Sequence, residues 1–133
     1  MKAISSKMSK ALNLGCLVNV ADNSGAKLVR IFSVKGGKSV RGRQIACGVS
    51  DLVKVSVRKG DFEMRKQVFW AVVVRQKKEY RRLTGERVSF YDNSVVLLKD
   101  DKGNPKGTQI KGPIAREVSE RWPFVSKLAR TIV

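Results

Sequence analysis

The sequence predicts a mainly β fold, a small barrel of short strands with a short helical segment at its C-terminal end. About six short runs rich in β-branched and aromatic residues are separated by Gly, Asn and Asp turn signals, and the last thirty or so residues change to helical spacing. With 133 residues, 42% of them hydrophobic, the chain can build one core without metals or disulfides. We predict a single domain over residues 1–133, with the barrel over about 12–112 and the helices over about 114–130.

The first two strands are predicted to form a hairpin. Two β-branched runs, residues 16–21 and 27–34, flank the sequence DNSG. Asp22 and Asn23 suit a turn, and Gly25 can adopt a positive φ. The next segment, KGGKSVRGR (residues 35–43), has three glycines, four cations and no acid, so we expect a mobile, exposed loop.

Two longer strands follow this loop. LVKVSVRKG (residues 52–60) alternates valines with polar residues, which is typical of a half-buried strand. VFWAVVVRQ (residues 68–76) is apolar on both faces until Arg75, which indicates a strand covered on both sides. We therefore place Phe69 and Trp70 in the core.

A cationic hairpin is predicted after the buried strand. RQKKEYRR (residues 75–82) holds five cations, one tyrosine and one glutamate, and Thr84 and Gly85 mark a turn before TGERVSFY resumes alternation. Strand alternation separates the segment into two faces. One face has Arg75, Lys77, Glu79 and Arg81, and the other has Gln76, Lys78, Tyr80 and Arg82. Both faces of the hairpin would then carry cations.

The C-terminal part begins with one more strand, SVVLL (residues 94–98), and a turn, DDKGNPKG (residues 100–107). Ile114 and Val118 are four residues apart and Glu117 can pair with Arg121, which predicts a short helix. Pro123 suits the first position of a second short helix.

The charge balance predicts a polyanionic partner. The chain has 28 Lys and Arg against 11 Asp and Glu, a formal net charge of +17, and a pI near 10.5. Sixteen of these cations lie between Lys27 and Arg82, against four acids. The longest apolar run, residues 68–74, is far shorter than the roughly 20 residues of a membrane-spanning helix. The first fifteen residues lack the apolar core of a secretory signal, so we expect no membrane contact and a cytoplasmic protein.

The composition argues against an enzyme. The chain has no histidine, and Cys16 and Cys47 have no CxxC pairing, so we predict buried free thiols, no metal, no cofactor and no small-molecule substrate. Asp92, Asp100 and Asp101 could hold a divalent ion in a nuclease, although adjacent carboxylates in a turn sequence are typical of solvated residues. A free-standing OB-like module that binds single strands is a further alternative, which would need exposed aromatics on the barrel.

Basic loops and strand ends can neutralise phosphates, and a tyrosine among them can stack on unpaired bases. The predicted RNA contacts are Lys35, Lys38, Arg41 and Arg43 in the glycine loop, Lys77, Lys78, Tyr80, Arg81 and Arg82 in the hairpin, and Lys106 and Lys111 near Pro113.

Several segments resemble a known family. AVVVRQKKEYRRLTGERVSFYDNSVVLL (residues 71–98) closely resembles the signature segment of the universal large-subunit ribosomal protein fourteen family, called twenty-three in eukaryotic cytoplasmic numbering. VADNSGAK (residues 20–27), KGNPKGTQIKGPIARE (residues 102–117) and the overall length fit the same family. The long segment before the aliphatic strand, ERWP near the end and the short N-terminus resemble archaeal-type members. Thr84 departs from the usual Asp, Asn or Ser, which affects turn preference only.

This resemblance implies a five-stranded β-barrel with a β-ribbon hairpin and a pair of short C-terminal helices. It implies a structural, non-enzymatic constituent of the large ribosomal subunit that binds large-subunit ribosomal RNA. It further implies an intersubunit bridge to small-subunit ribosomal RNA, large-subunit neighbours of the three and twenty-four types, and docking of an anti-association factor on an exposed surface.

Overall fold

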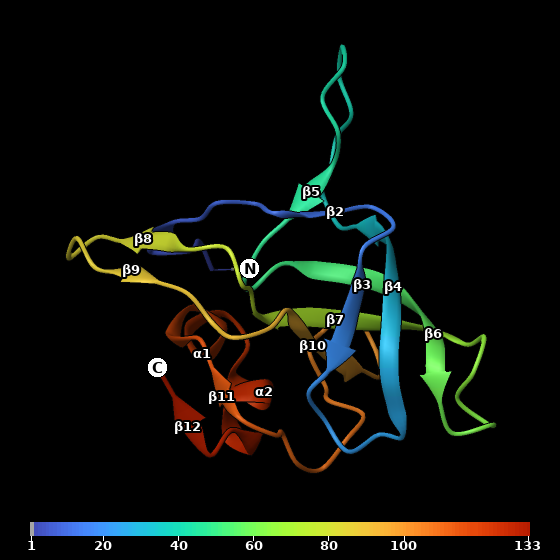
Figure 1. The fold of residues 1–133 in the computed structure, drawn as a ribbon. Coiled ribbons are helices and arrows are strands. Elements are labelled where there is room, and N and C mark those ends of the chain that lie inside the picture. Colours follow the sequence, from blue (N-terminus) through green and yellow to red (C-terminus); the bar gives the residue numbers. More distant parts are fainter. Residues whose placement is uncertain (1) are drawn as a thin grey trace.

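The computed structural model describes residues 2–133. Its centre is a closed barrel of five strands, neighbouring one another in the order β10-β3-β4-β6-β7 (Figure 1). The five are β3 (Leu17–Val20), β4 (Ala26–Val34), β6 (Leu52–Gly60), β7 (Val68–Arg75) and β10 (Ser94–Leu98). All neighbours are antiparallel except β10 and β3, which run parallel. The predicted mainly β barrel is confirmed.

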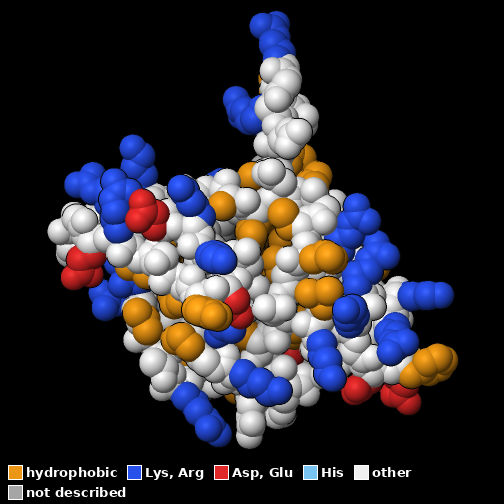
Figure 2. Space-filling model, viewed as in Figure 1, with side chains coloured by type: hydrophobic (Ala, Val, Ile, Leu, Met, Phe, Trp, Pro, Cys, Tyr) orange, Lys and Arg blue, Asp and Glu red, His pale blue; other side chains and the backbone are white. Residues whose placement is uncertain are grey.

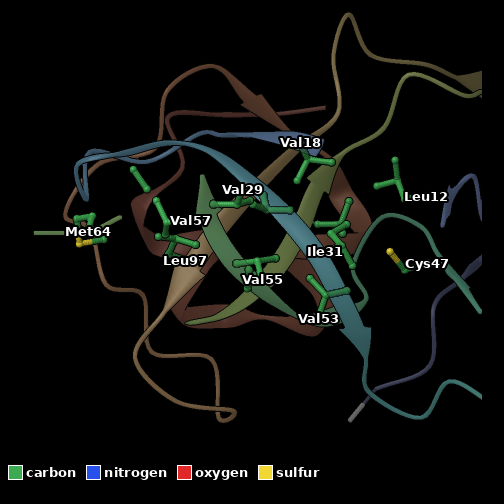
Figure 3. Packing of buried hydrophobic residues seen from close by; sticks show 14 residues of the cluster. Leu12, Val18, Val29, Ile31, Cys47, Val53, Val55, Val57, Met64 and Leu97 are labelled. Carbon is green, nitrogen blue, oxygen red and sulfur yellow. The ribbon is translucent and has the colours of Figure 1, made fainter. Parts of the chain in front are cut away.

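Alternate residues of the long strands fill the barrel. Val29 and Ile31 of β4 lie opposite Val57 and Val55 of β6, and all four side chains are at most 2% exposed (Figure 3). Each such side chain stabilises the fold by about 1.5–3 kcal/mol through removal of apolar surface from water. The half-buried strand predicted for residues 52–60 is therefore present, with its valines inward.

The turn between β3 and β4 is held by Asp22. Its Oδ1 accepts a 3.1 Å hydrogen bond from the Ser24 N–H, and its Oδ2 accepts one of 2.9 Å from the Leu97 N–H of β10. Gly25 has φ +101°, and a Cβ there would lie 2.6 Å from Asp61 Oδ2. The positive φ is what favours glycine here, since the Asp61 carboxylate could shift away from a Cβ, and the predicted hairpin is confirmed with its turn residues.

A second apolar layer covers the outside of β7. Val72 and Val74 point away from the barrel interior and pack in one buried cluster with Val118 of α1 (Arg116–Arg121) and Val125 of α2 (Pro123–Leu128). The strand is thus covered on both sides from Ala71 onward, as predicted, whereas Val68 is exposed and Phe69 and Trp70, predicted to be core, are only half-buried. Two short strands, β11 (Pro113–Ile114) and β12 (Thr131–Ile132), pair in parallel beside the helices. None of the helices in residues 2–133 is long and apolar enough to cross a membrane.

The helical segment differs from the prediction in two respects. Ile114 lies in β11, and α1 begins only at Arg116. The predicted Glu117–Arg121 pair is wrong: Glu117 pairs with Arg82 at 3.0 Å, and Arg121 lies 3.8 Å from Asp51. The cause is packing, because α1 turns Glu117 into the core, where a distant segment supplies its partner.

Two segments project from the barrel (Figure 1). The projecting loop, residues 35–45, rises above it and leads into β5 (Ala46–Cys47), which pairs with β2 (Leu12–Asn13). The ribbon extends sideways and contains β8 (Tyr80–Arg82), β9 (Arg87–Val88) and β1 (Ser6–Lys7). The Gly85 N–H donates a 3.0 Å hydrogen bond to the Arg82 carbonyl, so the predicted hairpin is present, although its second strand is short.

Both cysteines are free thiols, but the predicted burial holds only for Cys47. Cys47 is completely buried in the barrel cluster, whereas Cys16 is only half-buried.

Candidate nucleic-acid interface

Most of the positive charge has no acidic partner. All 28 Lys and Arg residues lie within residues 2–133, and only five of them have a carboxylate oxygen within 4.0 Å. Figure 2 shows Lys and Arg on both projections and along one side of the barrel, with few acidic side chains between them. Such a surface repels itself, and a polyanion relieves this repulsion.

The projecting loop presents three of the free cations. Every residue from 35 to 44 is exposed. Lys38, Arg41 and Arg43 have no carboxylate within 4.0 Å, while Lys35 lies 3.7 Å from Asp101. Short local bonds shape the loop, including one of 3.0 Å from the Arg43 N–H to the Val40 carbonyl. The loop therefore holds several cations away from the barrel, as its composition predicts.

The ribbon aligns cations across three strands. Arg81 of β8 lies opposite Lys7 of β1 on one side and Arg87 of β9 on the other. Residues directly opposite in a sheet share a face, and like charges in such pairs destabilise it. All three are exposed and line one hollow of about 360 Å³, where Glu79 offsets part of the charge by pairing with Arg87 at 3.2 Å. We call Lys7, Arg81 and Arg87 the cation row.

Lys7 and Arg87 are not among the contacts predicted from the sequence. Lys7 precedes Arg81 by more than seventy residues, and only the pairing of β1 with β8 brings them together. Arg87 had a local signal, because the predicted hairpin already placed it on the arm opposite Arg81.

Tyr80 and Arg82 are part of the core, which corrects their predicted role. Tyr80 is 1% exposed and Arg82 is 8% exposed. The Tyr80 hydroxyl donates a 2.7 Å hydrogen bond to Glu117 Oε2, and Arg82 Nε donates one of 3.0 Å to Glu117 Oε1. Burial, followed by the Glu117 hydrogen bond, raises the pKa of Tyr80. Neither side chain is accessible to a base or a phosphate, so neither remains a candidate RNA contact.

Two further residues of the cationic segment are also structural. Arg75 pairs with Asp92 at 2.8 Å and donates to the carbonyls of Lys111 and Pro113 at 2.9 Å each. Gln76 is fully buried and accepts a 3.1 Å hydrogen bond from the Val49 N–H. Of the two predicted faces, one keeps Lys77 and Arg81 exposed, and the other keeps only Lys78, because Gln76, Tyr80 and Arg82 are buried. The exposed residues of the segment are Lys77, Lys78, Glu79 and Arg81.

Lys106 and Lys111 differ in their surroundings. Lys106 is half-buried, with its Nζ 4.9 Å from the centroid of the Phe69 ring. Lys111 is exposed, and its backbone carbonyl accepts the hydrogen bond from Arg75. Lys111 keeps a free ammonium group for a partner, whereas the ammonium group of Lys106 lies over an aromatic ring.

The three candidate metal carboxylates have other partners. Burial alone would raise the pKa of Asp92, but hydrogen bonds from Arg75 and Ser94 outweigh it, and the pKa lies below the usual value. Asp100 Oδ2 accepts a 2.8 Å hydrogen bond from Asn104 within its turn, and Asp101 faces Lys35. In residues 2–133, no three Asp, Glu, His or Cys side chains cluster in a way that could hold a metal ion.

Comparison with known proteins agrees with this surface and fold. Residues 11–133 match the family described as Ribosomal protein L14p/L23e. Over all 133 residues of both chains, the protein is 57% identical to "Large ribosomal subunit protein uL14" of Nanoarchaeum equitans and 53% identical to that of Methanoregula boonei. The protein of the same name from Methanocorpusculum labreanum is 49% identical over the same length. The chain therefore belongs to the ribosomal protein L14p/L23e family, whose members are structural, non-enzymatic proteins of the large ribosomal subunit.

Proposed function

We propose that this protein binds large-subunit ribosomal RNA through its two cationic projections and contributes to a bridge between the ribosomal subunits. The observation that carries the RNA-binding part is the cation row. Three like charges are held opposite one another on adjacent strands, with a single glutamate beside them. This arrangement costs stability in the free protein and becomes favourable when a phosphate backbone lies along the ribbon.

Lys38, Arg41 and Arg43 of the projecting loop supply the second contact. Lys77, Lys78 and Lys111 are exposed and are further candidate contacts outside the loop. A rigid barrel that carries two separate projections can engage two RNA segments at once (Figure 1). Phosphate contacts of this kind fix position and orientation without reading sequence. The same geometry supports the bridge, because one projection can bind large-subunit ribosomal RNA while the other binds small-subunit ribosomal RNA.

An apolar surface on the barrel supports contact with neighbouring ribosomal proteins. Leu14, Phe32 and Val68 are each 44–53% exposed and line a hollow of about 490 Å³ together with Arg30 and Arg58. Exposed apolar surface of this kind is typical of protein interfaces. We propose this surface as the contact for large-subunit proteins of the three or twenty-four types, and an exposed surface elsewhere for an anti-association factor.

The RNA-binding proposal is tested by filter binding to protein-free large-subunit ribosomal RNA over a range of salt concentrations. The triple variant K7Q/R81Q/R87Q should reduce the slope of log affinity against log salt by about 0.7–0.9 for each phosphate that the variant no longer neutralises. K102Q/K127Q/R130Q removes the same charge from exposed positions outside the cation row and should reduce the slope less. Equal effects of the two triples would contradict a role for the ribbon.

The bridge is tested separately by reconstituting large subunits with each variant and measuring subunit joining by light scattering. We expect variants in one projection to prevent incorporation into the large subunit. Variants in the other projection should be incorporated normally, but the reconstituted large subunits should join small subunits more weakly. Normal joining with both sets of variants would exclude the bridge while leaving RNA binding intact.

A further inference from the structure

A cationic hollow lies beside the base of the projecting loop, and it includes a residue outside every segment proposed above. Its volume is about 430 Å³, within the range of small-ligand sites. Lys10, Lys38 and Arg43 line it, together with Gln44 and the glycines 36 and 37. None of the described residues that line it is acidic, in contrast to the hollow of the ribbon, which includes Glu79.

Tertiary structure assembles this hollow from two distant segments. The ladder between β2 and β5, in which Leu12 lies opposite Cys47 and Asn13 opposite Ala46, holds the N-terminal segment against the base of the loop. Lys10, two residues before β2, therefore meets a loop that begins 25 residues later in the chain. The loop supplies the other two cations.

One wall of the hollow is bare backbone. A Cβ on Gly37 would lie 2.6 Å from Ile45 Cγ2 and 3.2 Å from the Val34 carbonyl oxygen, so glycine is needed for the two arms of the loop to meet. Gly36 beside it also lacks a side chain, and a Cβ there would meet nothing within 4 Å. A ligand can thus approach the loop backbone closely.

Three cations around one concavity, none with a carboxylate within 4.0 Å, create a local positive potential. An arginine fork and two ammonium groups match the several oxygens of a phosphate, and the Gln44 amide can bond a neighbouring hydroxyl. We propose that this hollow binds a backbone phosphate of an RNA strand, with Lys10, Lys38 and Arg43 as its ligands. The proposal rests on the proposed RNA-binding function, which it deepens by naming a shared phosphate and a contact from the N-terminal segment.

The test is a double-mutant cycle measured by filter binding to protein-free large-subunit ribosomal RNA. K10Q and K38Q should each weaken binding, and the double variant should lose less than the sum of the two losses in log affinity, because both lysines contact one phosphate. K127Q on α2 is the control partner, and its combination with K10Q should be additive. Unchanged affinity of K10Q, or additivity of K10Q with K38Q, would overturn the shared site.

A second variant leaves the charge unchanged. Gly37→Ala should weaken RNA binding as K10Q does, because it forces the arms of the loop apart, while the midpoint of urea unfolding stays near that of the wild type. If Gly37→Ala bound RNA with wild-type affinity, the role proposed for the loop backbone at Gly37 would be contradicted. If instead wild-type protein shows no salt-dependent binding to the RNA, the proposed function itself fails.

A final arm distinguishes RNA from free phosphate. The amide resonances of residues 36 and 37 are followed by NMR on addition of RNA or inorganic phosphate at matched ionic strength. We expect RNA to shift them in the wild type but not in K10Q, and inorganic phosphate to act only at far higher concentration. Saturation by inorganic phosphate at concentrations as low as those of RNA would overturn the assignment to an RNA backbone.

Discussion

The Tyr80 hydroxyl donates a 2.7 Å hydrogen bond to Glu117 Oε2, which ties the ribbon to the first helix. Arg82 completes this connection by pairing with the same carboxylate and donating a 2.6 Å hydrogen bond to the Val133 backbone oxygen. The buried face of the ribbon is thus anchored to the C-terminal segment, and the opposite face presents the cation row. Two buried residues thus flank one exposed cation along a single short strand.

Tyr80→Phe should lower the free energy of unfolding by about 1.5 kcal/mol, because a buried carboxylate loses one hydrogen-bond donor while it keeps Arg82. Urea unfolding measures the change. Tyr91→Phe is the matched control, because Tyr91 is 98% exposed, and it should change stability by less than about 0.5 kcal/mol. Equal losses in the two variants would contradict the role of the Tyr80 hydroxyl.

Arg82→Ala and Arg81→Ala should separate stability from binding. The first leaves the Glu117 carboxylate buried without its counter-ion and should cost about 3–5 kcal/mol in unfolding free energy. The second removes an exposed cation that lies opposite two like charges, so it should raise the unfolding free energy by up to about 1 kcal/mol while reducing the salt slope of RNA binding by about 0.7–0.9. Unfolding curves and filter binding on both proteins test this. A large stability loss in Arg81→Ala, or a large binding loss in Arg82→Ala, would show that Arg81 is the buried residue and Arg82 the exposed one.

The Arg75–Asp92 pair should make stability depend on pH in the acid range. The pKa of Asp92 in the folded protein is below its ordinary value of 3.8, so the folded state binds fewer protons at this group than the unfolded state. Its contribution is complete well above pH 3.8 and is lost as the pH falls through the lowered value. The stability difference between wild type and Asp92→Asn should therefore be largest near pH 6 and shrink below about pH 4. A difference that does not change with pH would contradict this.

Cys47 should be inert in the folded protein. It is 0% exposed, and burial, followed by the nearby Asp51 carboxylate, raises the pKa of its thiol to about 12. Because the thiolate is the reactive form, a thiol reagent at about pH 8 should label Cys16 first and Cys47 only after denaturation in urea. Cys47→Ser should leave native labelling unchanged, and Cys16→Ser should abolish it. Rapid native labelling of Cys16→Ser would contradict the burial of Cys47.

Local sequence patterns were sufficient for most of the fold. The period-two alternation of residues 52–60, the DNSG turn and Pro123 at the start of α2 depend on neighbours in the chain, and the structure confirms each. The charge excess and the family resemblance likewise needed no coordinates. Patterns failed where a partner is distant: Glu117 had a suitable local partner in Arg121, yet packing paired it with Arg82.

The sequence by itself determined that this protein is a basic, mainly β member of a ribosomal family with charged loops, because periodicity, turn chemistry and composition are local properties. Only the tertiary structure decided which cations are free. Their patterns predicted Arg75, Tyr80 and Arg82 at the surface, but they are buried by contacts 17 to 51 positions away in the chain. Lys7 and Lys10 had no local signal and reach the cationic surfaces through short ladders. The physical reason is that burial and charge pairing are set by which segments pack together, and a strand's own residues do not specify its neighbours.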